Sequence, residues 1–428
     1  MSKETDSLRA GAGRAALALE DILPLEGFAR VNDPLHVRAL VLETDRRVVL
    51  VSVETTSVPE PIAADWRQRI AGRAGTAAEN VWLTLTHSFA GPHIVTARRP
   101  GEPPRPHVPT AEQLAEGERL RRAYEAALDT ALNAALAGLR PAKLAAAQGR
   151  CGLAASRDLR GQSGWLLGTD DDEPVDSALT VLRVDTAEGE PLAAVLVYGL
   201  RSAVMHRCRM PDGAEAVSAD LCGAACSALE RELGGGATAL FLCGAAADQE
   251  PRLKGWDTVL DAAGEPHERL LSAPEADVLR SAQGEHLARC ALKLRRAAAD
   301  LTAAPHLAAA QQDFVWPGKK ADPAVVPGEA RLAGFTPDGE RRQTVYALRL
   351  GALELIGVQP EFDAAASFAI AAQAGPDRLR AGVCMVNGCG KCMPSLRAYD
   401  TARFQADHSP FMPGAAERMV EVAAALKL

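Results

Sequence analysis

One order of predicted elements, a β-hairpin followed by a helix and then a single strand, occurs three times along this chain of 428 residues. Paired β-rich runs predict each hairpin, apolar residues at helical spacing predict each helix, and a short β-branched run predicts each closing strand. Such a repeat favours one large α/β domain over residues 1–428, with mixed β-sheets flanked by helices. The predicted hairpins lie at 37–54, 178–200 and 344–358, the helices at 59–73, 218–233 and 363–372, and the closing strands at 81–86, 238–243 and 382–387.

The regions outside the repeated units predict additional elements. Residues 111–139, 265–301 and 413–426 have helical spacing, and Thr110 followed by Gln113 has the spacing of a capping box. The apolar residues 15–19 near the N-terminus predict a strand at the edge of a sheet.

Composition excludes several functional classes. The net charge of −8 and the pI of about 5.7 give no electrostatic basis for binding nucleic acid or an acidic membrane surface. No apolar run approaches the roughly 20 residues that a membrane span needs, and residues 1–10 lack the apolar segment of a secretion signal. We therefore expect a cytoplasmic protein with a small-molecule substrate. The odd number of cysteines, 9, fits reduced thiols or metal ligands better than a disulfide framework.

The first closing strand leads into a polar motif. Val81–Thr86 has the alternation of a buried strand, and His87 follows it directly before Gly91 and Pro92 begin a loop. Proteins of the α/β class often carry chemistry where a strand gives way to a loop, because the scaffold is rigid there. A lone histidine at a strand end is more often structural, so the argument for His87 depends on similar residues elsewhere.

Metal-competent side chains follow strands of the other two units. His206 follows the second hairpin, Glu361 follows the third, and Cys389 and Cys392 follow the third closing strand. Two imidazoles, a carboxylate and a thiolate from matching strand ends would suit one divalent ion, and zinc accepts all three donor types while keeping a position for water. The competing interpretation is a set of satisfied polar groups without a metal, because the residues are far apart in sequence.

Cys389 and Cys392 form a Cys-x-x-Cys motif with several interpretations. A structural zinc site would need a second such pair, and a redox pair would need a thioredoxin-like βαβ pattern at the chain start. One cysteine as a metal ligand and the other as its neighbour fits the strand-end position best.

Several segments resemble motifs of the neutral or alkaline (non-lysosomal) ceramidase family. This resemblance implies the fold of that family's catalytic domain, without its C-terminal immunoglobulin-like domain and its secretion signal. The segment 80–92 resembles the family's Thr-His-Thr-His-Ser-Gly-Pro motif, Met205 and His206 with 217–223 resemble His-Pro and Ser-x-Asp-x-x-Gly, and 241–252 resemble Gly-Ala-Ala-Gly-Asp-x-x-Pro. The similarity continues through 387–395, Tyr399 and 409–418, and so spans nearly the whole chain.

The resemblance also implies a zinc site. The family's ligands are two histidines, a glutamate and a tyrosine, which correspond to His87, His206, Glu361 and Cys392. A thiolate in place of the phenolate departs from the family. It would hold zinc more tightly and would admit copper or iron as alternatives.

Other positions of the family's active site are partly changed. Its second histidine is Phe89, and the tyrosine associated with stabilising the reacting carbonyl falls on Phe404. Its arginine corresponds to Arg157, which would stabilise an oxyanion. An acidic position corresponds to Glu250, and Glu250 or Asp248 would transfer protons or hold a neighbouring loop. The residues expected to line a pocket drier than the family's are Phe89, Cys389 and Phe404.

These observations predict a metal-dependent hydrolase, with zinc as the expected metal, that cleaves an amide or related C–N bond of a small molecule by a metal-activated water. Ceramide is not the expected substrate, because the sequence contains no apolar membrane anchor. Two alternatives stay open. One is a non-hydrolytic metalloenzyme of specialised biosynthesis, such as a cyclase, a lyase or a copper- or iron-dependent oxidase. The other is a degenerate family member that binds a metal or a partner through Cys384, Cys389 and Cys392.

Overall fold

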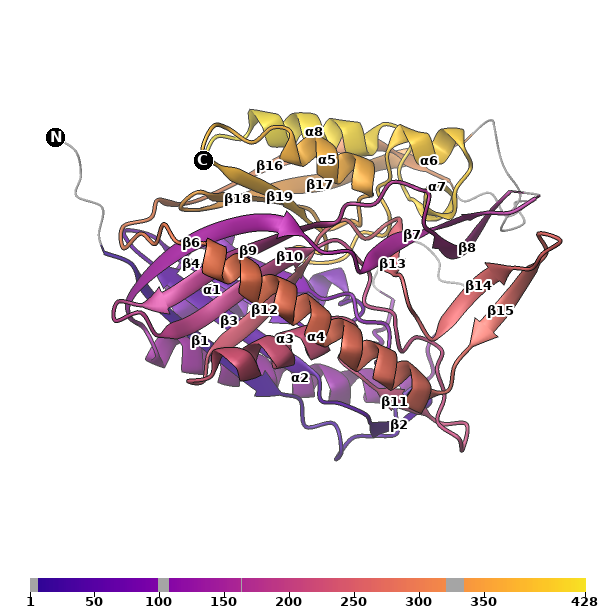
Figure 1. The fold of residues 1–428 in the computed structure, drawn as a ribbon, viewed down its shortest axis with the longest axis horizontal. Helices are drawn as coiled ribbons and strands as arrows, with labels where there is room; N and C mark the ends of the chain where they lie inside the picture. The colour runs from indigo at the N-terminus through magenta and orange to yellow at the C-terminus, as the bar shows by residue number, and fades with distance from the viewer. Residues whose placement is uncertain (1–6, 99–107, 163, 321–334) are drawn as a thin grey trace.

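The computed structural model describes residues 7–98, 108–162, 164–320 and 335–428. Its largest part is an eight-stranded mixed sheet (Figure 1). Two neighbouring pairs of strands at opposite ends of this sheet run parallel, and the other pairs are antiparallel. In spatial order the strands are β12 (Thr238–Cys243), β10 (Pro191–Tyr198), β9 (Ala178–Thr186), β6 (Arg140–Arg150), β1 (Arg9–Ala16), β3 (His36–Glu43), β4 (Arg47–Val53) and β5 (Val81–Leu85).

A second, four-stranded sheet packs against the inner face of the large sheet. The two faces share one apolar core, in which Leu50 and Trp82 of the large sheet meet Leu348 and Leu355 of the smaller one. The smaller sheet has the order β16 (Leu307–Lys319), β17 (Pro337–Leu350), β18 (Leu353–Gly357) and β19 (Leu379–Val383). There are three further small sheets among the described residues. One pairs β2 (Phe28–Val31) with β11 (Glu215–Val217), and another pairs β14 (Trp256–Leu260) with β15 (Pro266–Leu270). In the third, β7 (Ala154–Arg160) lies between β8 (Trp165–Asp170) and β13 (Gln249–Pro251).

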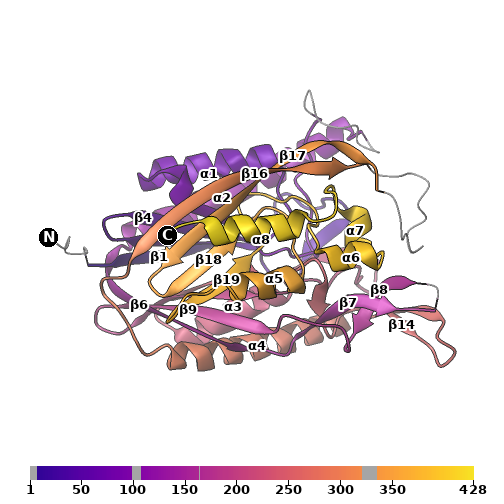
Figure 2. The ribbon, with the colours of Figure 1, turned by 90° about the horizontal axis from the view of Figure 1, so that it is seen from above.

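Helices cover the outer faces of both sheets (Figures 1 and 2). The helices α1 (Glu60–Ala74) and α2 (Ala111–Ala137) pack on the β1, β3 and β5 side, whereas α3 (Asp220–Leu233) and α4 (Ala273–Ala297) pack on the β6, β9 and β12 side. The helices α5 (Ala364–Ala371) and α8 (Ala415–Ala425) cover the smaller sheet. The remaining helical elements are the 3-10 turn Ala78–Asn80, α6 (Leu396–Asp400) and α7 (Phe404–His408).

The structure confirms the predicted repeat. In each unit the closing strand lies parallel to the second strand of its hairpin: β5 beside β4, β12 beside β10, and β19 beside β18. The helix between them supplies the crossover that a parallel pair requires. The capping box is also present, because Thr110 accepts a hydrogen bond from the Gln113 amide at 3.2 Å and donates its own amide to the Gln113 side chain at 3.0 Å.

Two sequence-based expectations were wrong. The N-terminal strand β1 lies inside the large sheet, between β6 and β3, rather than at an edge. Its small residues allow α2 to approach closely: a Cβ at Gly11 would lie 2.0 Å from the Ala135 carbonyl oxygen, and one at Gly13 would lie 2.4 Å from that of Ala131. The sequence therefore lacked the large apolar residues that mark an interior strand.

The second error concerns the helix expected over 265–301. Residues 266–270 form β15, which pairs with β14, and the helix α4 begins only at Ala273 after a capping box formed by Ser272 and Glu275. Pairing with β14 therefore makes residues 266–270 a strand, although their apolar residues have helical spacing.

Candidate metal and catalytic site

The closing strands of the three repeated units meet at their carboxyl ends. The amide of Leu85, at the end of β5, donates to the Met385 carbonyl at 3.3 Å, and the amide of Cys384, after β19, donates to the Cys243 carbonyl at the end of β12 at 2.7 Å. Leu83 and Asn387 join β5 to the segment after β19 more firmly. The Asn387 amide donates to the Leu83 carbonyl at 2.6 Å, and the Asn387 side chain accepts from the Leu83 amide at 3.0 Å. Residues that follow these strands are therefore gathered in one region.

His87 is held rigidly in this region. Its backbone has a φ of 57°, in the left-handed region that non-glycine residues rarely adopt. The ring is buried, and its Nδ1 donates to the Thr56 carbonyl oxygen at 2.9 Å. A histidine whose Nδ1–H is bonded to a backbone carbonyl presents Nε2 as the free donor atom, which is the usual arrangement of a metal-binding imidazole.

Nε2 of His87 lies 3.0 Å from Oε2 of Glu361. Within the described residues, neither of these buried atoms has a hydrogen-bond partner of acceptable geometry. Burial alone would lower the pKa of His87, but the Glu361 carboxylate outweighs it and raises that pKa. Burial would likewise raise the pKa of Glu361, and His87 lowers it. These pKa shifts favour the charged forms of both groups, so the contact is an ion pair in the metal-free protein, and the same two buried atoms fit two ligands of one cation.

Cys392 lies beside Glu361 on an adjacent extended segment. The Glu361 amide donates to the Lys391 carbonyl at 2.8 Å, and the Met393 amide donates to the Glu361 carbonyl at 2.7 Å, so residues 361 and 392 form a parallel bridge. The Cys392 thiol is buried, and burial followed by the Glu361 charge raises its pKa. The neighbouring Cys389 points elsewhere, because its Sγ donates to the Val58 carbonyl at 3.3 Å.

His206 and His87 both contact the Phe89 ring. The Phe89 ring centroid is 4.7 Å from that of His87 and 5.3 Å from that of His206. The turn before His206 is fixed by Asp220, whose carboxylate accepts the amides of Val204 at 3.0 Å and Met205 at 2.9 Å. Burial lowers the pKa of His206, which favours the neutral imidazole that a metal requires.

Arg157, on β7, brings a buried cation to the same region. Its Nε donates to the Ala247 carbonyl at 2.7 Å, and its Nη1 lies 3.7 Å from Glu250. Among the described residues this Nη1 has no hydrogen-bond partner. Burial would lower the pKa of Arg157, but the carboxylates of Glu250 and Glu361 raise it, so the guanidinium stays charged.

Glu250 and Phe404 surround the Arg157 guanidinium. Glu250 also accepts from Lys254 at 2.7 Å and Arg201 at 3.2 Å. Burial would raise the pKa of Glu250, but the charges of Lys254 and Arg157 lower it. The Phe404 ring centroid lies 5.0 Å from the Arg157 Cζ, so an aromatic face covers the cation. Glu250 is thus an ionised carboxylate that holds Arg157 in place.

Asp248 takes a different position. Both of its oxygens accept the Ala364 amide at 3.1 Å, at the start of α5. Burial and the nearby Asp363 raise its pKa well above the usual value. Its contacts hold the N-terminus of a helix.

Several residues of this site were not predicted from the sequence. Thr56 contributes only a backbone oxygen, and no side-chain pattern marks it. The Arg201 guanidinium lies 4.1 Å from the Phe89 ring centroid, and Lys254 is buried against Glu250. In the sequence, only the closeness of Arg201 to His206 and of Lys254 to Glu250 could have indicated them.

The four predicted metal ligands are only partly gathered. His87 and Glu361 are in contact, Cys392 is joined to Glu361 by a backbone bridge, and His206 contacts the Phe89 ring that also contacts His87. Across the described ranges, the one set that places three ligand atoms within 4.8 Å of one another is Cys151, His286 and Cys290, and none of the four predicted ligands belongs to it. The complete four-ligand shell stays a prediction.

Comparisons with known proteins agree with the architecture. No protein-family model and no curated protein sequence matches the chain. In the described part of the chain, no helix is both long and apolar enough to cross a membrane. A solved ceramidase complexed with C2 matches with a TM-score of 0.71 and 16% identity, covering 98% of this chain and 74% of the other. The neutral ceramidase of Pseudomonas aeruginosa matches with a TM-score of 0.70, the same identity and the same coverage. The chain therefore has a neutral-ceramidase-like fold.

Proposed function

We propose that this protein is a metal-dependent hydrolase that cleaves an amide or related C–N bond of a small molecule. The observation that carries the proposal is the buried contact between His87 Nε2 and Glu361 Oε2, 3.0 Å apart and without a hydrogen bond in the described structure. The fold shared with ceramidases supports an amide as the substrate class.

His87 and Glu361 would hold the metal, and His206 and Cys392 would complete its ligands. Zinc is the expected ion, and the thiol of Cys392 leaves copper or iron as alternatives. When bound, such an ion lowers the pKa of a coordinated water to about 7 and polarises a carbonyl oxygen.

Arg157 would act on the substrate. Its unpaired Nη1 is a buried donor of fixed position, suited to an oxygen on which negative charge develops. Glu250 would position Arg157 rather than transfer protons, since the cations around it keep its pKa low and make it a weak base. Asp248 would support the loop before α5.

Phe89 and Phe404 would restrict the chemistry and the substrate. Both place hydrocarbon rings beside polar groups, Phe89 between two imidazoles and Phe404 over Arg157. They exclude water and donate no hydrogen bond. We propose that the substrate is a small molecule met in the cytoplasm rather than a membrane lipid.

The experiment combines metal analysis with a panel of simple N-acyl amines. Protein purified without added metal should contain about one ion at this site, which His206→Ala loses and His306→Ala, a histidine next to β16, retains. Cys392→Ser should weaken metal binding strongly, and Cys389→Ser only mildly. A protein that fails to bind zinc on dialysis, or that turns over no member of the panel, contradicts the proposal.

A second function is favoured by the replacement of two hydrogen-bond donors with Phe89 and Phe404. A site with a thiol and few carbonyl-stabilising donors suits a non-hydrolytic metalloenzyme that performs ring closure, elimination or a copper- or iron-dependent oxidation. Redox activity of copper- or iron-loaded protein, with no hydrolysis of the amide panel, would identify it.

A further inference from the structure

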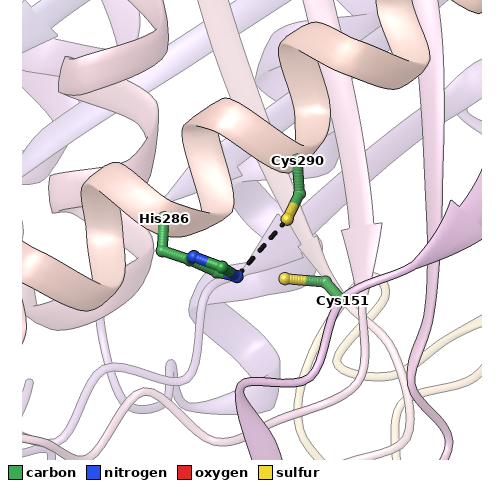
Figure 3. A group of neighbouring side chains, drawn as sticks. All are labelled: Cys151, His286 and Cys290. Atoms are coloured by element: carbon green, nitrogen blue, oxygen red, sulfur yellow. Dashed lines mark hydrogen bonds between the residues drawn. The ribbon is translucent and has the colours of Figure 1, made fainter.

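A group of metal-competent side chains lies outside the candidate site. His286 and Cys290 project from α4, and Cys151 directly follows β6 (Figure 3). The two sulfurs and the imidazole nitrogen all lie within 4.8 Å of one another. No residue of this group belongs to the predicted ligand set around His87.

The backbone around Cys151 is fixed by hydrogen bonds. The Cys151 amide donates to the Ser177 carbonyl at 2.9 Å, and its carbonyl accepts from the Tyr198 hydroxyl at 2.6 Å. That hydroxyl in turn accepts from the Ala154 amide at 3.0 Å. The side chain of Cys151 is only 2% exposed, so the thiol has little freedom to turn away.

The other two side chains are equally well placed. His286 and Cys290 are four residues apart on one helix, a spacing that puts both on the same face. The helix α4 packs against β6 and β9, which directs that face towards Cys151. The group is therefore assembled before any ligand binds.

The separation of the donor atoms fits a metal ion. Nε2 of His286 lies 3.6 Å from Sγ of Cys290. In a tetrahedral zinc site with Zn–S of about 2.3 Å and Zn–N of about 2.0–2.1 Å, a sulfur and a nitrogen ligand are roughly 3.6 Å apart. Cys151 and Cys290 are both free thiols, and a disulfide between them would leave the imidazole without a role.

We propose that Cys151, His286 and Cys290 form a second site for a thiophilic metal ion, with zinc as the natural probe. Two thiolates would balance the charge of Zn²⁺, and water would take the fourth position, because His286 is exposed and Cys290 half-buried. The ion would join α4 to the start of the segment that leads into β7. That strand carries Arg157, so the second site would secure the strand on which the proposed catalytic cation lies.

The test is peptide-resolved alkylation of the reduced full-length chain with and without Zn²⁺. Zinc should slow the reaction of Cys290 with iodoacetamide by at least about tenfold, because a metal-bound thiolate is shielded. His286→Ala should abolish this protection, and His267→Ala, an exposed histidine on β15, should retain it. In a His87→Ala background, which removes the contribution of Cys392, cobalt should give a thiolate-to-metal charge-transfer absorption that a further Cys151→Ser change weakens strongly. The His87→Ala background separates this site from the one in the proposed function.

Three results would overturn the proposal. Equal alkylation of Cys290 with and without zinc would show that no ion binds there. A linked Cys151–Cys290 peptide in protein isolated without reductant, with no zinc protection after reduction, would identify a redox pair instead. If Cys151→Ser does not fold, the exposed His286→Ala variant still decides the question, and unchanged protection in that variant rules the site out.

Discussion

Replacing Glu361 by Gln separates a metal ligand from an ordinary buried ion pair. The substitution keeps the shape of the side chain and removes only its charge, 3.0 Å from His87 Nε2. If the pair holds a metal, the variant should bind zinc much more weakly while its metal-free form stays nearly as stable as the parent. The neutral amide leaves no uncompensated charge in the core, since His87 can also be neutral.

The magnitude follows from typical zinc affinities. Four-ligand sites bind zinc with roughly 10–16 kcal/mol, or about 3–4 kcal/mol for each ligand. At about 1.4 kcal/mol for each factor of ten, Glu361→Gln should weaken zinc binding by roughly 10²–10³-fold. His87→Ala behaves differently, because it leaves the buried Glu361 carboxylate without its imidazole partner. That variant should lose zinc and also about 3–5 kcal/mol of the free energy of unfolding.

The assay is a zinc titration in competition with a coloured chelator, paired with urea denaturation of the metal-free protein. Both should be done in a His286→Ala background, so that zinc at the Cys151 group does not contribute. The reasoning is refuted if Glu361→Gln keeps its zinc affinity within about threefold while losing several kcal/mol of metal-free stability. That result would describe an ion pair with a structural role.

Three other predictions follow from the geometry. Arg157→Met should lower turnover of a responsive N-acyl amine by roughly 10²–10³-fold with its metal content unchanged, whereas Arg201→Met, a second cation on the same carboxylate, should lower it less than about tenfold. Long-chain ceramide should not be hydrolysed, because Phe89 and Phe404 offer no donor to its carbonyl; steady release of fatty acid would contradict this. Burial lowers the pKa of Lys319 from 10.5 to about 8, although the charge of Asp407 opposes the change. Between about pH 8 and pH 10.5 the unfolded chain therefore binds more protons than the native protein. The free energy of unfolding should gain up to about 1.4 kcal/mol per pH unit from this lysine as pH rises through that window, a gain that Lys319→Met removes in denaturant titrations at several pH values.

The sequence was most informative where one pattern recurs. The hairpins and closing strands of the three units carry dense β-branched runs, and the buried, parallel pairing of each closing strand with its hairpin is what such runs favour. The strand β1 was misplaced because Gly11 and Gly13 serve the close approach of α2 instead of adding side chains to the core. The strand β15 was missed because its exposed residues give no alternating pattern and only β14 defines it.

The same contrast holds for the site. Strand ends and motif similarity pointed to His87, Glu361 and Arg157, and the structure places all three in one region. The contact between His87 and Glu361 could not be read from the sequence, because it depends on a left-handed backbone at His87 and on a bridge between residues 361 and 392. The Cys151 group escaped notice for a related reason. Its members are remote in the chain, and only the packing of α4 on β6 brings them together.

The two hydrogen bonds between Asn387 and Leu83 have a mechanical consequence. They bond β5, at the edge of the large sheet, to the segment after β19, close to the residues that each sheet contributes to the site. These bonds oppose separation of the sheets at this end, so the substrate of the proposed hydrolase would enter past the surrounding loops. For the same reason, an ion bound at the proposed metal site should not leave by a local opening. In a slow thermal ramp, its release and the loss of tertiary structure should occur as one transition.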